Sequence, residues 1–399
     1  MSERADLPTP EGEYVEANRF APLSFLLAIV GIVGLGLSVV GAFVSPTQFS
    51  FSWLFAFAFY FTILAGCFFW IIVHHVVDAE WSVVVRRQLE NLAMLLAVMA
   101  VFFIPIVVFR HRLYEWMNIK VGLDAVLDSK RAYLNWHFFV FRSIFYFVFF
   151  IAATLLFRRF SIRQDKDGNP AFTINMRRVA FVSLPLFAAS ITFGAYDWLL
   201  GIDYRWFSTM WGVYIFAGAA GSSMSLLVLV ISALKKAGYL QETVTMEHYH
   251  IMGKWMLAFS VFWAYIGFSQ YMLIWYANMP EETEYFIHRN TESWNAASLV
   301  LVIGRFFIPF AVLLMQGLKK KPARICLIAG WVVFMQMVDM YIVILPALHK
   351  TGVFISIWDF VSLIGMGATL AFVFLWILRR SSLFPNRDPR LLESLHIVN

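Results

Sequence analysis

An arginine interrupts one of the most apolar stretches of the sequence. Residues 133–147 read YLNWHFFVFRSIFYF, with Arg142 as the one arginine among them, and residues 292–310 read ESWNAASLVLVIGRFFIPF, with Arg305 in a similar setting. A guanidinium keeps its charge and carries only hydrogen-bond donors, so each arginine needs a carboxylate or another acceptor beside it. Such a pair could fix the position of a polar head group or set the electric field along a route for protons.

The composition gives the setting of these arginines. The chain of 399 residues is 61% hydrophobic, 18% aromatic and 14% charged, with a mean hydropathy of +0.72. Soluble globular proteins are less apolar than this. Apolar stretches of about 20 residues recur along the chain, each long enough to cross a hydrocarbon layer of roughly 30 Å. The composition therefore predicts an all-α polytopic membrane protein.

Ten membrane spans are predicted, between an N-terminal arm (1–19), expected to be poorly ordered, and a C-terminal tail (381–399). The ten spans form a membrane domain over 20–380. They cover residues 20–43, 49–77, 89–109, 132–157, 179–200, 207–234, 253–278, 292–316, 324–347 and 355–378.

The two arginines are predicted to lie near the membrane midplane. Arg142 follows Tyr133 by nine residues, or about 14 Å of helix, and Arg305 follows Trp294 by eleven, or about 16 Å. They lie four spans apart, on helices of the same direction. This spacing suggests two related halves, 49–200 (spans two to five) and 207–347 (spans six to nine), although little else aligns between them.

The partners of these arginines must come from the few polar residues inside the spans. One interpretation is structural: buried pairs that fix helix packing. The other is functional: a polar route for protons or a pocket for a quinone head group. The sequence does not separate the two. The candidate partners are Asp197, Asp339, Asp359, Tyr265, Ser269 and Gln270.

A proton route is predicted from titratable residues near both membrane faces. At the end of span two, IIVHHVVDAEW places His74 and Asp78 four residues apart on one helix face, with His75 and Glu80 close by. Simple solvation at the membrane surface is the alternative for these groups. The remaining candidates are Asn135, His137 and Arg142 from the opposite face, and Tyr265, Gln270, Arg305, Asp339 and Asp197 in the interior.

No redox centre is expected in this chain. Its two cysteines, Cys67 and Cys326, lie in separate spans and form no cluster or haem-attachment motif. The span histidines His74 and His75 lie near the face opposite to that of His137, so they are not expected to share a haem. No motif for phosphate binding or hydrolysis is present. We therefore expect no catalytic residue and no bound metal or cofactor.

The orientation follows from the positive charges in the connections. Of the 31 lysines and arginines, 21 fall in the termini and the even-numbered loops and 8 in the odd-numbered loops. Because positively charged loops stay in the cytoplasm, both termini are predicted to be cytoplasmic. The net charge of +6 is thus explained by topology and does not indicate a nucleic-acid partner.

Two stretches carry a resemblance to a known family. SKRAYLNWHFFVFRSIFYF (129–147) and WAYIGFSQYMLIWYANMPEETEYF (263–286) resemble the NrfD-like membrane subunits of bacterial Alternative Complex III, a quinol:cytochrome c oxidoreductase, and the second resembles the shorter, ActF-type subunits. Within the family pattern Y-L-N-x-x-F-F-x-x-R, this chain supplies Tyr133, Leu134, Asn135, Phe138, Phe139 and Arg142.

The resemblance implies two four-helix bundles, spans two to five and six to nine, flanked by spans one and ten in the bacterial cytoplasmic membrane. It implies as partners a longer ActC-like sister subunit, an iron–sulfur subunit and haem-c subunits, which carry electrons from menaquinol or ubiquinol to cytochrome c or directly to a terminal oxidase. The quinol site is usually assigned to the ActC-like subunit. The resemblance therefore does not assign a quinone site to this chain.

Three functions remain open at this point. The chain could support quinol oxidation and conduct protons as a subunit of such a complex, it could be a structural scaffold of that complex, or it could be an independent secondary transporter. A transporter would favour broken helices at matched positions of the two halves. The prolines Pro105, Pro185, Pro309 and Pro346 are not matched in this way.

The charge asymmetry generates a topology prediction. In a variant without the native cysteines, a membrane-impermeant thiol reagent is expected to label Glu282→Cys only from the periplasmic side and Lys320→Cys only from the cytoplasmic side. Labelling of either site from the wrong side would contradict the predicted orientation.

Overall fold

The fold is all-helical. The computed structural model describes residues 11–16 and 18–398, contains no strands in these ranges, and has ten helical segments long and apolar enough to cross a membrane. The protein is therefore a multi-pass membrane protein, as predicted. The ten segments are α1 (Ala21–Val44), α2 (Pro46–Val76), α3–α5 (Val83–Ala93, Leu96–Phe102, Ile104–Val108), α8 (Trp136–Asp167), α9 with η2 (Ala171–Trp198, Leu200–Ile202), α10 (Trp211–Lys236), α11 (Met246–Ala277), α13–η3–α14 (Glu292–Val302, Ile303–Phe307, Ile308–Leu314), α16 with η4 (Pro322–Ile344, Leu345–Ala347) and α17 (Ile357–Leu378).

The helices end where the sequence supplies turn residues or caps. Residues with positive φ close three of the long helices: Asp78 (55°) after α2, Gly168 (66°) after α8 and Asn278 (48°) after α11. Asn135 caps the start of α8 because its side chain accepts a hydrogen bond from the Phe138 N–H. These local signals divide the apolar sequence into separate spans.

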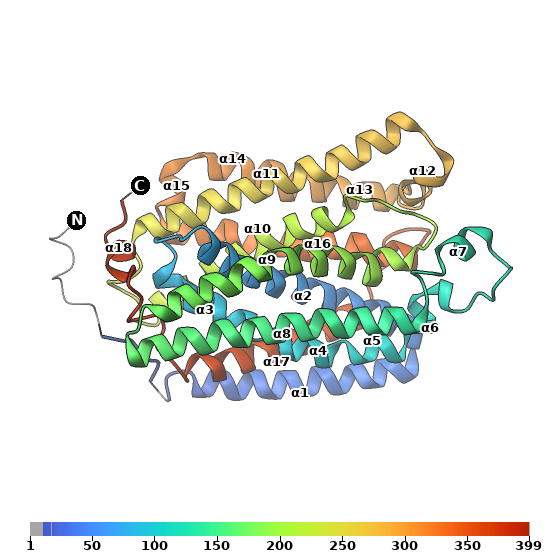
Figure 1. The fold of residues 1–399 in the computed structure, drawn as a ribbon. Helices are drawn as coiled ribbons and strands as arrows, with labels where there is room; N and C mark the ends of the chain where they lie inside the picture. The colour runs from blue at the N-terminus through green and yellow to red at the C-terminus, as the bar shows by residue number, and fades with distance from the viewer. Residues whose placement is uncertain (1–10, 17, 399) are drawn as a thin grey trace.

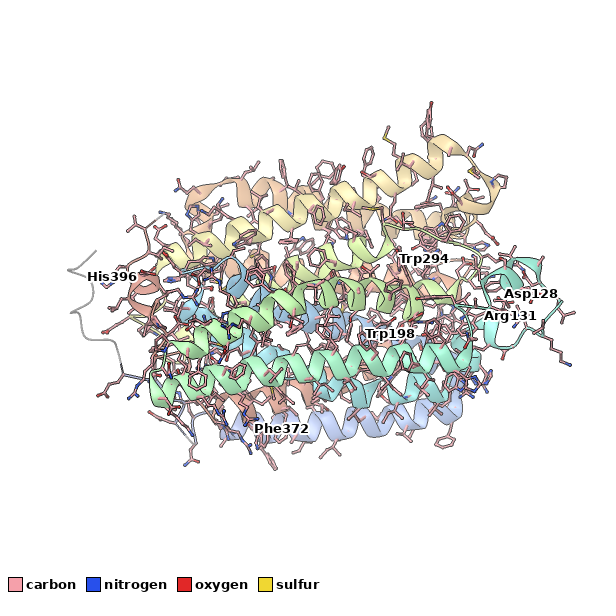
Figure 2. The ribbon with its side chains drawn as sticks, in the orientation of Figure 1. Asp128, Arg131, Trp198, Trp294, Phe372 and His396 are labelled. Atoms are coloured by element: carbon pink, nitrogen blue, oxygen red, sulfur yellow. The ribbon has the colours of Figure 1, made fainter. Side chains whose placement is uncertain are left out.

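The long helices run side by side between two ends of the molecule (Figure 1). We call the end that carries the C-terminus and α18 (Leu391–Leu395) the terminal end. The opposite end carries the short helices α6 (Arg110–Leu113), α7 (Ala125–Lys130) and α12 (Pro280–Ile287), together with η1 (Glu115–Met117). Figure 2 places His396 at the terminal end and Asp128 and Arg131 at the opposite end.

Helices α2 and α10 form the centre of the structure. In their most apolar windows, 83% of the α2 residues and 72% of the α10 residues are buried, against 17% in α1. Helix α2 contacts α3, α4 and α9, while α10 contacts α11 and α16. The two central helices also contact one another, and α10 contacts α9. Every other span therefore packs directly or indirectly on this central pair.

A close approach of backbones joins the central pair. A Cβ added to Gly66 of α2 would lie 2.2 Å from the carbonyl oxygen of Ala219 in α10, so only glycine fits there. One turn further along α2, the Trp70 indole donates a hydrogen bond to the Ala220 carbonyl oxygen (3.0 Å). Small residues at a helix crossing allow such contact within a membrane.

The first and last spans form a flanking pair. Helix α1 packs mainly on α17, and Gly34 and Gly365 face one another at their crossing, where a Cβ on Gly34 would lie 2.6 Å from the Gly365 Cα. Helix α17 in turn contacts α2. The flanking pair therefore reaches the centre of the molecule through α17.

The expected disorder of the N-terminal arm is wrong for its described residues; residues 1–10 and 17 lie outside the described ranges. The Glu13 carbonyl oxygen accepts a hydrogen bond from the Leu383 N–H (2.8 Å), and its carboxylate accepts from the Leu240 N–H (2.9 Å). Val15 is buried. The arm is ordered because it covers backbone donors of two loops at the terminal end.

The backbone approach at Gly66 generates a stability prediction. Gly66→Ala should destabilise the protein by about 1–3 kcal/mol, since over-packing a tight helix crossing forces the backbones apart. Thermal unfolding in detergent measures the effect. Gly330→Ala in α16 is the matched control, because a Cβ there meets nothing within 4 Å. Equal melting temperatures for the two variants would contradict the proposed contact.

Candidate functional site

The first arginine pair joins α8 to α9. The Arg142 guanidinium donates two hydrogen bonds to the Asp197 carboxylate, from Nε to Oδ2 (2.8 Å) and from Nη2 to Oδ1 (2.6 Å). Its Nη1 donates to the Tyr133 carbonyl oxygen (3.1 Å), and the Tyr146 hydroxyl donates to Asp197 Oδ2 (2.9 Å). The guanidinium also lies over the Tyr133 and Phe138 rings, 3.8 and 4.1 Å from their centroids. Every polar group of this pair is satisfied in a bidentate, charge-assisted geometry.

The second arginine pair joins η3 to α16. Arg305 Nη1 lies 3.2 Å from Asp339 Oδ2, and its Nη2 donates to Gln336 Oε1. The Asp339 carboxylate also accepts hydrogen bonds from the Tyr214 hydroxyl (2.5 Å) and the Trp263 indole (3.1 Å). Both charged side chains are buried. Four spans therefore contribute to one polar centre, which is reached from α10, α11, η3 and α16.

The backbone around Arg305 is shaped to admit the guanidinium. Residues Ile303–Phe307 form a π-helical turn, which interrupts the α-helix at this arginine. Such turns are rare and occur often at functional sites. On the facing helix, a Cβ added to Gly218 would lie 2.8 Å from Arg305 Nη2. A local helix distortion and a glycine thus make room for one buried charge.

The two arginines lie at different distances from the starts of their helical segments. Helix α8 begins at Trp136, later than the predicted start of the span, so Arg142 lies only about 9 Å from the start of a 32-residue helix. Arg305 lies about 20 Å from Glu292, near the middle of a segment of 23 residues. Arg142 therefore lies nearer to one end of its helix than the sequence predicted, and Arg305 lies near the middle of its segment; the midplane position of Arg142 stays a prediction.

A third buried carboxylate, Asp359, has neutral partners. Its Oδ1 accepts from the Ser52 hydroxyl (2.5 Å) and its Oδ2 from the Ser356 N–H (2.8 Å), as part of the cap of α17. Gln48 links this site to His349, because its Oε1 lies 2.8 Å from the His349 Nε2. Asp359 therefore is a partner of neither arginine, in contrast to Asp197 and Asp339.

A third group of charges, most of them buried, lies at the terminal end and was not predicted from the sequence. Arg86 Nη2 lies 2.7 Å from Asp388 Oδ2, and Arg87 Nη2 lies 2.5 Å from Asp165 Oδ2. Glu90 lies between three arginines, at 3.5–3.6 Å from each. We call this group the terminal charge cluster; it comprises Asp78, Arg86, Arg87, Glu90, Arg158, Asp165, Asp388 and Arg390.

The C-terminal segment completes this cluster. Burial alone would raise the pKa of the Asp388 carboxyl, but the Arg86 and Arg390 guanidinium groups and the Arg390 N–H lower that pKa well below its usual range. Asp388 therefore stays ionised near neutral pH, and the stability it contributes is lost only as the pH falls through this lowered pKa. Residues such as Arg86 and Arg87 were predicted as loop charges, because their partner Asp388 lies about 300 residues away in sequence.

His74 and Asp78 do not lie one turn apart on one helix face, although this was predicted. Helix α2 ends at Val76, and Asp78 adopts a positive φ of 55°, which turns it away from the helix face of His74. His74 is 3% exposed and packs edge to face on Trp81, whereas Asp78 binds Arg390 and lies 3.5 Å from Arg177. His75 stacks on Phe157. The His74 nitrogens and the Nε2 of His75 have no hydrogen-bond partner among the described residues.

Several other predicted route residues lie apart from the two arginine pairs. Asn135 is a helix cap, and His137 is exposed. Tyr265 is 63% exposed on the outer face of α11, and Gln270 accepts a hydrogen bond from Ser208 (2.9 Å). The structure thus brings together Arg142 with Asp197 and Arg305 with Asp339. It does not join Asn135, His137, Tyr265 and Gln270 to either pair.

The polar residues of α2 are separated by apolar stretches. Thr62 Oγ1 accepts a hydrogen bond from Gln336 Nε2 (3.1 Å), which connects α2 to the Arg305 pair. Ten residues separate Thr62 from Ser52 and twelve separate it from His74, or about 15 and 18 Å of helix. The intervening α2 residues are almost all apolar and buried. Direct side-chain hydrogen bonds along α2 therefore do not connect the two ends.

No group of three or more histidine, cysteine, aspartate or glutamate side chains that could hold a metal ion occurs within residues 11–16 and 18–398. Cys67 is buried and Cys326 is half-buried, and both are free thiols. Comparison with known proteins finds no family model that matches the chain and no curated protein that matches it.

The Arg142 pair generates a mutational prediction. Arg142→Leu should cost about 3–5 kcal/mol of stability, because it leaves the buried Asp197 carboxylate without its cation. The double variant Arg142→Leu with Asp197→Asn should recover part of this loss, since it removes the uncompensated charge. Thermal unfolding in detergent measures both. A single variant as stable as the wild type would contradict a structural role for the pair.

Proposed function

We propose that the chain is an integral membrane subunit of a quinol:electron-acceptor oxidoreductase of the Alternative Complex III type, and that it supports quinol oxidation and conducts protons. The observation that carries the proposal is the repeated arginine–aspartate pair, with the arginine in the fourth or eighth span and the aspartate in the span that follows. Buried ion pairs are costly in a membrane, and they recur at proton and substrate routes of membrane proteins.

The helix contacts support the corresponding architecture. We interpret spans two to five and six to nine as two four-helix bundles, flanked by α1 and α17. Each bundle then contains one arginine–aspartate pair. The motifs at 129–147 and 263–286 support the family assignment, and they include Arg142, Tyr133 and Trp263, which take part in the two pairs. Both termini are proposed to lie in the cytoplasm.

The two pairs are suited to different roles. The bidentate Arg142–Asp197 pair holds the loop before α8 through the Tyr133 carbonyl, which makes it a fixed strut between helices. Asp339 instead lies beside a phenol and an indole, and its bond with Tyr214 joins two groups that can each hold a proton. We therefore assign proton handling to Asp339, with Arg305 setting the field and keeping its own proton.

Electron transfer is assigned to partner subunits. The proposed partners are an ActC-like sister subunit, which holds the quinol site, an iron–sulfur subunit and haem-c subunits, with a terminal oxidase as the acceptor in some assemblies. This chain contributes the membrane-embedded part and contacts membrane lipids. This assignment does not require the chain itself to contact menaquinol or ubiquinol.

A structural scaffold is the second candidate. The apolar stretches of α2 on either side of Thr62 favour it, because a proton route requires side chains or waters within hydrogen-bond reach of one another. A scaffold would need the same ion pairs for packing alone. The two functions differ in their expectation for the loss of the Asp339 carboxylate: a proton route predicts loss of proton translocation, and a scaffold predicts an effect on assembly alone.

Purification of the chain from its native membranes tests the class of complex. Iron–sulfur and haem-c subunits are expected to co-purify in a fixed ratio, measured by haem absorbance, iron content and mass spectrometry. Asp339→Asn in the purified complex should then keep quinol oxidation in detergent and lose proton translocation in liposomes. Asp359→Asn is the matched control, since it removes a buried carboxyl group that has no arginine partner. Normal translocation by Asp339→Asn, or a chain that purifies alone, would contradict the proposal.

A further inference from the structure

A small cavity lies at the opposite end, between the connection after α9 and the start of α10, α12, and the end of α16. Its polar lining comprises Asp203, Trp206, Trp211, Tyr285, His288 and Arg289. The cavity volume is about 30 Å³, and a site needs roughly 10–15 Å³ to admit one water. It therefore has room for at least one water.

Two donors at this cavity lack acceptors. Trp206 and Trp211 are 2% and 4% exposed, and neither indole Nε1 has a hydrogen-bond partner among the described residues. Buried polar groups are nearly always satisfied, by protein or by ordered water. Two orphan indoles lining one cavity indicate an occupant that accepts hydrogen bonds.

The side chains that line the cavity are fixed by packing, so they cannot move to give the two indoles an acceptor. Trp206 stacks on Tyr285, with ring centroids 4.0 Å apart, and Trp211 packs edge to face on both rings. Arg289 ties α12 to α16, because it donates to the carbonyl oxygens of Tyr285 (2.9 Å) and Val343 (3.0 Å) and lies over the Tyr285 ring. The tryptophans are therefore held in place.

The lining also selects the chemistry of the occupant. The indoles only donate hydrogen bonds, whereas the Asp203 carboxylate only accepts them. An anion would satisfy the indoles but would be repelled by the carboxylate, and Arg289 already donates hydrogen bonds to the Tyr285 and Val343 carbonyls. Water both accepts and donates, and it needs two to four polar partners, which this lining supplies.

We propose that this cavity is a hydrated site in which water accepts hydrogen bonds from Trp206 and Trp211 and donates to Asp203. Trp211 stacks on Tyr214, with centroids 5.6 Å apart, and the Tyr214 hydroxyl donates to Asp339. The site thus places water beside Trp211, which stacks on the tyrosine that binds Asp339 of the Arg305 pair. On the proposed function, this cavity, and not Asn135 and His137, is the entrance of the proton route at this end.

Radiolytic hydroxyl-radical footprinting of the wild-type protein tests the hydrated site, because bound water generates radicals that oxidise adjacent side chains. Trp206 and Trp211 should be oxidised several times faster than Trp198 and Trp294. These controls, both labelled in Figure 2, are 3% and 0% exposed, and their indoles donate to Ser143 and to the His349 carbonyl. Equal rates for all four would overturn the proposal.

The variant Ala347→Leu tests whether the radicals that oxidise Trp206 and Trp211 come from bound water or from bulk solvent. Ala347 lines the cavity, and a larger side chain there should displace the water and lower the rates of Trp206 and Trp211 to those of the controls. Rates that stay high in this variant would also overturn the proposal. Footprinting does not depend on enzyme activity, so its result is distinguishable from any failure of the co-purification or proton measurements.

Discussion

The contact between α2 and α10 is the constraint on which the rest of the structure depends. Because Gly66 has no side chain, the two backbones approach closely enough for Trp70 to bond the Ala220 carbonyl. The polar centre around Arg305 lies beside this contact, where Gly218 of α10 leaves room for the guanidinium and Thr62 of α2 bonds Gln336. A wider separation of the two helices would remove the backbone contact and the hydrogen bonds together.

The spans could be predicted from sequence, and the partners of the two arginines could be narrowed to a short set of candidates without being assigned. Apolar runs of membrane length are visible in the residue order, and a midspan arginine has few carboxylates to choose from, so Asp197 and Asp339 were among six candidates. The position of Arg142 along its helix was not predictable to the same degree, because it depends on where α8 begins. That start is set by the Asn135 cap, which reads as part of the apolar run in the sequence.

The terminal charge cluster shows where sequence reasoning fails. Arg86 and Arg87 look like ordinary loop charges, and Asp388 looks like part of a solvated tail. Their burial depends on contacts between residues about 300 positions apart, which no local pattern reports. The one available signal was the density of charge at 86–90 directly beside a long apolar run. A similar limit applied to His74 and Asp78, whose relation depended on the residue at which α2 stops.

The packing of both chain ends against early helices has a consequence for biosynthesis. Among the ten spans, α1 is made before α17, the helix that covers it, and Arg86 of α3 obtains Asp388 only after α17 is complete. A chain that stops before residue 388 would keep the buried Arg86 without its nearest carboxylate, with only Glu90 at 3.6 Å beside it. Truncated products are therefore expected to be poor at maturing and readily recognised by membrane proteases, so the segment around Asp388 acts as a check that all ten spans have been made.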